Sequence, residues 1–139
     1  MKKTFLIVAA LVSFTAFAFA GDVPDIMIDV APNVLNLQKT VEKCVTVHTD
    51  IPYSLVEAHS VELEVGENEP ISIYRWKSDD RGYFVAKFKM SDVLELDFAI
   101  GDDNAFTLIG NRKDGAEFWG TQDILVVDNV PINDPKGPR

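Results

Sequence analysis

The sequence contains a single cysteine, Cys44, two histidines and few basic residues. One cysteine excludes a disulfide framework, and Cys44, His48 and His59 are too few for a structural zinc site, which takes four ligands. Lys and Arg number 13 against 22 Asp and Glu, which gives a net charge of −9. Because nucleic-acid binders present a basic surface to phosphates, this charge argues against a nucleic-acid partner.

Signatures of catalysis are missing as well. No G-x-S-x-G turn presents a serine nucleophile, and the glycines do not cluster at a strand-to-helix junction as they do in phosphate-binding loops. Carboxylates are numerous, but most acidic side chains of a small domain are solvated surface charge. We therefore expect no catalytic residues and no enzyme, and rank a small hydrolase third among the functions considered.

The first 20 residues have the pattern of a secretory signal peptide. Lys2 and Lys3 form a basic start, residues 4–17 are almost wholly apolar, and the small-x-small sequence Ala-Phe-Ala ends at Ala20. The apolar run is shorter than the roughly 20 residues that cross a bilayer, so we expect cleavage rather than a membrane anchor. The mature chain would be exported to the periplasm or the cell exterior, and its later apolar runs are too short to span a membrane.

The mature chain is expected to form one domain, residues 21–130. With 47% hydrophobic and 25% charged residues, the composition is that of a folded protein, and a chain of this size can bury a core without a metal or a disulfide. Residues 131–139 are rich in Pro, Gly and polar residues and are predicted to form a flexible tail. Because residues 1–20 contain Lys2 and Lys3 but no acid, the mature net charge is −11.

Alternation of apolar and polar residues predicts strands along almost the whole mature chain. Residues 54–59 are predicted to form a loop or one helical turn, and residues 91–96 a crossover between sheets. About seven strands with turns at this spacing indicate an all-β fold, a β-sandwich. The predicted strands are residues 26–30, 40–51, 60–65, 71–76, 83–90, 105–111 and 116–128, and the fourth and fifth form a hairpin.

Several segments resemble a known family. The sequence IDVAPNVLNL at residues 28–37 resembles the IDIKPGS…NSINL opening of immunoglobulin-like modules in secreted bacterial and archaeal proteins. Residues 106–110 and 114–124 are similar to the closing hairpin of those modules, LTG followed by DG-x-x-F-x-G-x-D-x-I. The similarity extends over residues 26–128. It implies an immunoglobulin-like β-sandwich in an extracytoplasmic setting and implies no reaction.

Aromatic side chains are the candidates for ligand binding. Alternation places Tyr74 and Trp76 on one face of a strand and puts Trp119 out of phase with Phe118. Exposed flat rings can stack on sugar rings, so a carbohydrate is one candidate ligand. Large rings more often fill the core between two sheets, and the core is the position we expect for each tryptophan.

Two acidic turns are candidates for a calcium site. One contains Asp79 and Asp80; the other, which is the stronger candidate, combines Asp97 with Asp102 and Asp103. Neither has the D-x-D-x-D-G spacing of a dedicated calcium loop, and Asp in turns usually bonds its own backbone. We therefore expect no cofactor and keep calcium as the ion to test.

These features predict an exported, non-enzymatic binding or structural module. Its sheet faces or end loops would contact a protein or cell-surface partner, because exposed faces and loops are what a sandwich offers to other molecules. The alternative is a carbohydrate-binding module that uses Tyr74, Trp76 and Trp119.

Overall fold

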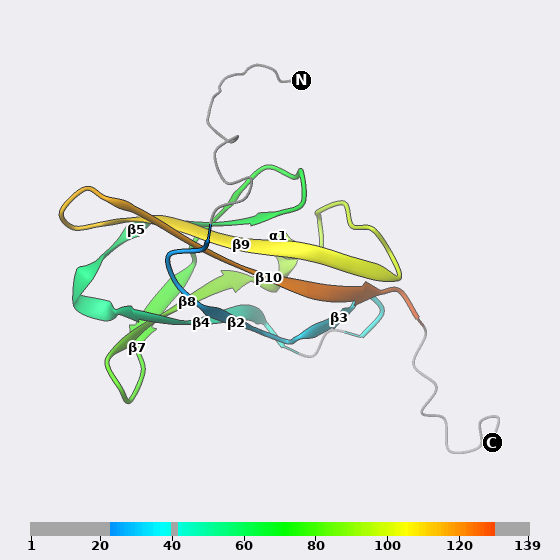
Figure 1. Cartoon of the computed structure of the whole chain (residues 1–139). Coiled ribbons are helices and arrows are strands. Elements are labelled where there is room, and N and C mark those ends of the chain that lie inside the picture. Colours follow the sequence, from blue (N-terminus) through cyan, green and yellow to red (C-terminus); the bar gives the residue numbers. More distant parts are fainter. Residues whose placement is uncertain (1–22, 40–41, 130–139) are drawn as a thin grey trace.

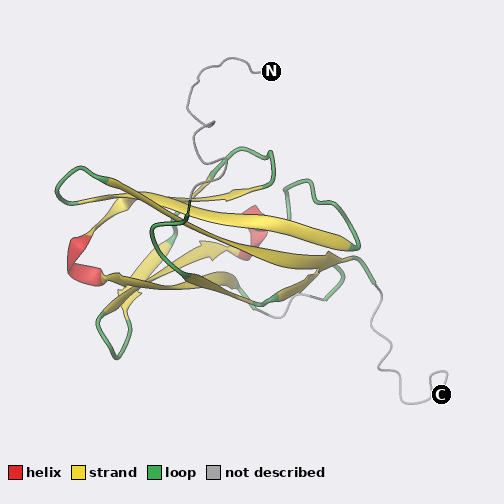
Figure 2. Ribbon diagram, viewed as in Figure 1, coloured by secondary structure: helices red, strands yellow, loops and turns green. Residues whose placement is uncertain are grey.

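The computed structural model describes residues 23–39 and 42–129, which form two β-sheets. The sheets face each other as the layers of a β-sandwich, which confirms the predicted all-β class (Figures 1 and 2). The predicted signal peptide, residues 1–20, and the predicted tail, residues 131–139, lie outside the described residues. In the described part of the chain, no helix has the length and apolar character needed to cross a membrane.

The first sheet has four antiparallel strands and the second has five. The four-stranded sheet has the order β2 (Ile28–Ala31), β4 (Cys44–Pro52), β8 (Tyr83–Lys89), β7 (Arg75–Ser78). The five-stranded sheet has the order β3 (Val34–Asn36), β10 (Glu117–Val127), β9 (Asp102–Arg112), β5 (Val56–Val65), β6 (Ile71–Ser72), with only β3 and β10 parallel. Two short helical turns, η3 (Tyr53–Leu55) and α1 (Met90–Val93), connect the sheets (Figure 2).

One hydrophobic core fills the space between the sheets. Successive side chains of a strand point to opposite faces, so alternate residues of the central strands meet in the middle. Phe84 and Phe88 of β8 lie opposite Phe106 of β9 and Phe118 of β10, and all four are almost fully buried. Each such side chain contributes about 1.5–3 kcal/mol of transfer free energy. The core therefore also fixes which residues of every strand point outward.

The structure divides the fourth predicted strand, residues 71–76, between the two sheets. β6 pairs with β5, whereas β7 pairs with β8. The N–H of Ile73 donates to the carbonyl of Val61 on β5, and the N–H of Tyr74 donates to the carbonyl of Lys87 on β8. The chain thus changes sheet at the Ile73–Tyr74 peptide, and the predicted hairpin is confirmed only for β7 and β8. Alternation does not detect this change because both segments keep a period of two.

Three other segments refine the sequence prediction. β3 was not predicted, because a run of three residues is too short for periodicity; it follows the cis Ala31–Pro32 peptide. In the predicted loop at residues 54–59, η3 supplies the helical turn, but β5 begins at Val56. The predicted crossover at residues 91–96 is confirmed, since α1 leads from β8 to β9.

Gly120 lies where the N-terminal segment crosses β10. The N–H groups of Asp25 and Ile26 both donate to the carbonyl of Trp119. A Cβ at Gly120 would stand 2.7 Å from the Ile26 carbonyl oxygen, which is backbone and has no rotamer that removes it. We predict that Gly120→Ala lowers the free energy of unfolding by about 1–3 kcal/mol in urea titrations.

Gly110→Ala is the matched control for this substitution. A Cβ at Gly110 would meet side-chain atoms of Phe118 and Val61 at 2.9 Å, and both side chains are buried in the core, so this substitution also lowers stability. The contact is longer than the 2.7 Å at Gly120, and side chains can shift more easily than the backbone. The expected loss of stability is therefore smaller than for Gly120→Ala. A Gly120→Ala protein as stable as wild type would contradict the docking of the N-terminal segment on β10.

Candidate functional site

Tyr74 is an exposed ring that contacts two cations. The sheet change at residues 73–74 places it beside β8, and 40% of its surface is exposed. The guanidinium carbon of Arg75 lies 5.0 Å from the centroid of the Tyr74 ring, and the Nζ of Lys89 lies 4.9 Å from it. Both distances lie within the range of cation–π attraction. The ring thus orients two positive charges on the surface of the sheet.

Trp76 borders this region from the inner side of the sheet. It pairs with Ala86 on β8 and packs partly buried against the core, and His59 contacts it edge to face with 4.9 Å between ring centroids. His59 reaches this position from the irregular part of β5 between Glu57 and Glu62, where the Ser60 hydroxyl accepts the N–H of Asn111. Trp76 therefore lies at the rim of the core rather than in its centre.

Tyr74, Arg75 and Trp76 line an open hollow of about 260 Å³. Two of the three predicted aromatic residues are thus brought together. Trp119 is on the other sheet, where it points outward, pairs with Ile109 and is partly buried, whereas Phe118 beside it is in the core. The expectation that each tryptophan fills the core is met in part by Trp76 and not by Trp119, because the register puts Phe118 on the inner side.

Four basic side chains share the outer face of the four-stranded sheet, which we call the cationic face. They are Arg75 and Lys77 on β7 and Lys87 and Lys89 on β8. The register sets Arg75 directly opposite Lys87. Side chains in such pairs have Cβ atoms about 4.5–5.5 Å apart, and like charges there destabilise the sheet. Folding alone does not favour this arrangement.

Acidic side chains on the same face lie away from the cations. Asp29 on β2 lies level with Lys77 across the sheet, but three inter-strand spacings, or about 14 Å, separate the two residues. Asp50 on β4 accepts the N–H of Met27 through its carboxylate, at 2.9 Å. The cationic face is therefore a region of positive charge on a chain whose net charge is −9.

Protection of a sheet edge does not explain the whole cationic face. Basic residues on an edge strand discourage pairing with another chain, and β7 is an edge strand. On β8, Lys87 is paired with Thr46 of β4 on one side and with Arg75 of β7 on the other, so Lys87 has no edge to protect. Local arrangements that cost stability without a structural role are characteristic of functional surfaces. The arrangement can bind a negatively charged group between Arg75 and Lys89.

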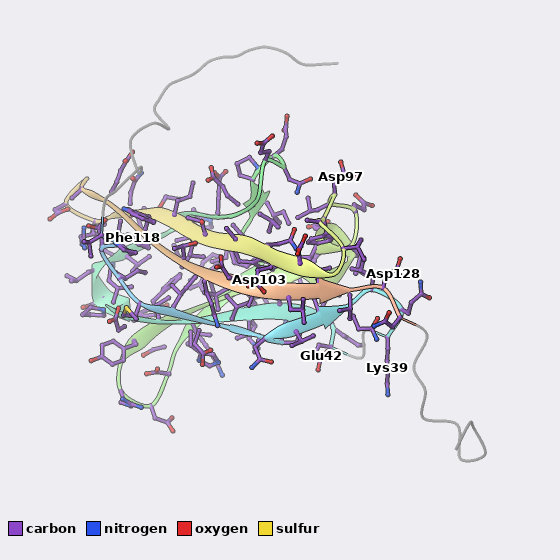
Figure 3. The ribbon with its side chains drawn as sticks, turned by 45° about the vertical axis from the view of Figure 1, so that its right-hand side comes forward. Lys39, Glu42, Asp97, Asp103, Phe118 and Asp128 are labelled. Atoms are coloured by element: carbon purple, nitrogen blue, oxygen red, sulfur yellow. The ribbon has the colours of Figure 1, made fainter. Side chains whose placement is uncertain are left out.

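The acidic residues proposed for calcium do not converge. Asp102 and Asp103 are successive residues of β9 and so point to opposite faces of the sheet. Asp97 lies in the loop before β9, apart from Asp103 in Figure 3. Among residues 23–39 and 42–129, no group of three or more His, Cys, Asp or Glu is placed to hold a metal ion.

Amide side chains hold the backbone of that loop. Asn104 accepts the N–H of Ala99 at 2.9 Å and donates to its carbonyl at 3.0 Å. Asn68 makes the same pair of bonds with Asp97, at 2.9 and 2.8 Å. In the other acidic turn, the Asp79 carboxylate accepts hydrogen bonds from the N–H groups of Tyr83 and Arg81. These bonds lower the pKa of Asp79, and the bond from Tyr83 has the larger effect. Both turns are thus organised by hydrogen bonds of the chain itself.

The outer face of the five-stranded sheet has the opposite charge, and we call it the acidic face. Its outward, paired positions carry six carboxylates and no Lys or Arg: Glu57, Glu62, Glu64, Asp103, Glu117 and Asp123. Burial raises the pKa of Glu62 and Glu64, and the charge of Glu62 raises that of Glu64 further. Alternation in residues 60–65 predicts that Glu62 and Glu64 point to the same side. Which strands lie beside them, and hence which other acids share the face, is known only from the fold.

The raised pKa of Glu62 predicts a stability that depends on pH. A carboxyl whose pKa is higher in the folded than in the unfolded state stabilises the fold as pH falls through the folded pKa toward its ordinary value of 4.5. We therefore expect Glu62→Gln to raise the free energy of unfolding at pH 7 and to reduce its increase on acidification, in urea titrations at several pH values.

Glu67→Gln, at an exposed position in the β5–β6 turn, is the control and should leave both quantities unchanged. A Glu62→Gln protein less stable than wild type at pH 7 would show that the charged carboxylate stabilises the fold, contrary to this prediction.

Comparisons with known proteins identify no relative of this chain. The chain matches no protein-family model, no curated protein and no solved structure. The resemblance to secreted immunoglobulin-like modules therefore stays a prediction from the sequence. What the structure itself contributes is a β-sandwich with one cationic face, one acidic face and an exposed tyrosine within cation–π distance of Arg75 and Lys89.

Proposed function

We propose that this chain is an exported, immunoglobulin-like, non-enzymatic binding module that contacts a negatively charged partner through its cationic face. The observation that carries the proposal is the direct opposition of Arg75 and Lys87 on the outer face of the four-stranded sheet. Binding of an anion relieves the repulsion between two such cations, so the partner supplies the free energy that the isolated fold lacks.

The order of the strands supports the immunoglobulin-like part of the proposal. With the nine described strands lettered A, A′, B, C, C′, D, E, F, G along the chain, the four-stranded sheet has the order A-B-E-D. The other sheet has the order G-F-C-C′, with A′ added parallel to G. The same two strand orders occur in the immunoglobulin sandwich, with the C′ strand of variable-type domains, and this agreement supports the proposal.

Export rests on residues 1–20. We predict that the full chain, expressed in a bacterium, is recovered outside the cytoplasm with Gly21 as its first residue, because the Ala-Phe-Ala sequence before it suits signal peptidase. Intact-mass measurement of the periplasmic and extracellular fractions checks this. Ala20→Asp should block the cleavage. A cytoplasmic chain that still begins at Met1 would contradict export.

Carbohydrate binding is the second candidate function, and the hollow beside Tyr74 favours it. The hollow is about 260 Å³ and open, whereas pockets that enclose small molecules measure about 300–1,000 Å³. It therefore suits one unit of a long polymer that continues beyond the site. Tyr74 and Trp76 would contribute the apolar contact and Arg75 a polar one.

Two probes of the same backbone but different charge test the docking surface. We expect the mature chain to bind dextran sulfate at low salt, with an affinity that falls steeply as salt rises, and to bind uncharged dextran far more weakly, by titration calorimetry. Arg75→Ala with Lys89→Ala should weaken dextran sulfate binding at least about tenfold, because the loss of two charge-assisted contacts costs more than about 1.4 kcal/mol.

Lys39→Ala with Lys113→Ala is the matched control. It also removes two exposed cations, but from loops outside the cationic face, and should change binding little. Equal losses in the two double variants would show that charge alone, and not the cationic face, determines binding. Binding of uncharged dextran that depends on Tyr74 would favour the carbohydrate module instead. Turnover of ester or glycoside substrates would contradict a non-enzymatic role.

A further inference from the structure

The two outer faces of the sandwich carry opposite charge. The cationic face presents Arg75, Lys77, Lys87 and Lys89, and the acidic face presents six carboxylates without a basic residue at its paired positions. The faces belong to different sheets and look in opposite directions, with the core between them (Figure 1). The excess of positive charge on one side and of negative charge on the other makes the molecule electrically asymmetric, which its net charge of −9 does not reveal.

The acidic face offers the partner that the cationic face requires. Glu62 and Glu64 lie side by side on β5 and are partly buried, so a cation brought above them would stabilise their charged forms. At one side of the same face, Val34 and Leu125 are paired across β3 and β10 and are 49% and 36% exposed. Tyr74, 40% exposed, is the matching apolar group within the cationic face.

We infer that the negatively charged partner is a second copy of this chain, whose acidic face docks on the cationic face of the first. This inference rests on the proposed function, because it names the partner of the same surface. The contact joins two different faces, so each copy keeps one face free and further copies can add head to tail. The module would then be a unit of an open chain or a closed ring.

The size of the faces sets the expected strength of the contact. Strands lie about 4.8 Å apart and rise about 3.3 Å per residue, so the four-stranded face measures roughly 15 Å by 25 Å. Stable interfaces of standard size bury about 800 Å² on each partner, which exceeds this flat area. We therefore expect a weak association, seen at high protein concentration and controlled by salt.

Sedimentation equilibrium of the mature chain tests the inference. We expect a weight-average mass about twofold or more above that of the monomer at roughly 10 mM salt, where the Debye length is about 30 Å, and a return to the monomer near 1 M, where it is about 3 Å. Arg75→Glu with Lys77→Glu should give monomers at both salt concentrations. Folding should not suffer, since the first substitution sets an acid opposite Lys87.

A second variant reverses the other face. Glu117→Lys with Asp123→Lys changes two exposed positions of β10 and should also give monomers. Mixing it with the Arg75→Glu, Lys77→Glu variant should restore a one-to-one dimer, because each partner then retains one native face. The control, Glu67→Lys with Asp92→Lys, changes the net charge by the same amount as Glu117→Lys with Asp123→Lys, but at exposed positions outside both faces. It should self-associate as the wild type does.

Each outcome distinguishes the two proposals. A monomer at every salt concentration that still binds dextran sulfate through Arg75 and Lys89 would overturn the self-association and leave the proposed function standing. Self-association that neither face variant changes would also overturn it. A chain that neither associates nor binds dextran sulfate would overturn both proposals.

Discussion

The contact between the inner faces of the two sheets is the interaction on which the rest of the structure depends. Phe84 and Phe88 from one sheet and Phe106 and Phe118 from the other are almost fully buried there. Because side chains alternate along a strand, burying one set of residues commits the other set to the surface. A slip of one residue in β8 would exchange Lys87 for Phe88, which the core opposes strongly. The positions of the surface charges are thus held by the packing beneath them.

Charge separation between the faces follows from this packing. Each acidic or basic residue is an ordinary polar residue in an alternating strand, and no single strand carries a complete face. The cationic face combines β7 with β8, and the acidic face combines β5, β9 and β10. Tyr74 fixes two of the cations through its ring. Its place there depends on the change of sheet one peptide bond earlier, so the site and the topology have a common origin.

The predicted ligand residues show how far local patterns reach. Tyr74 and Trp76 were chosen for their shared phase, and the structure does bring them to one hollow, but Trp76 faces inward and Tyr74 lies outside the regular strand. Trp119 points outward because Phe118 has the inner position. Asp97, Asp102 and Asp103 are close in sequence, yet strand alternation separates the last two. Proximity along a chain does not predict convergence when the segment is extended.

The sequence by itself determined the all-β class, the positions of most strands, the connection near residues 91–96 and the acidic balance of the chain. All of these depend on local properties: alternation, turn residues and composition. Only the tertiary structure decided the assignment of residues 71–72 and 75–78 to different sheets, the pairing of β3 with β10 and the sorting of charge into two faces. These depend on which strands lie side by side, and strand neighbours are set by burial and backbone hydrogen bonding between segments distant in sequence.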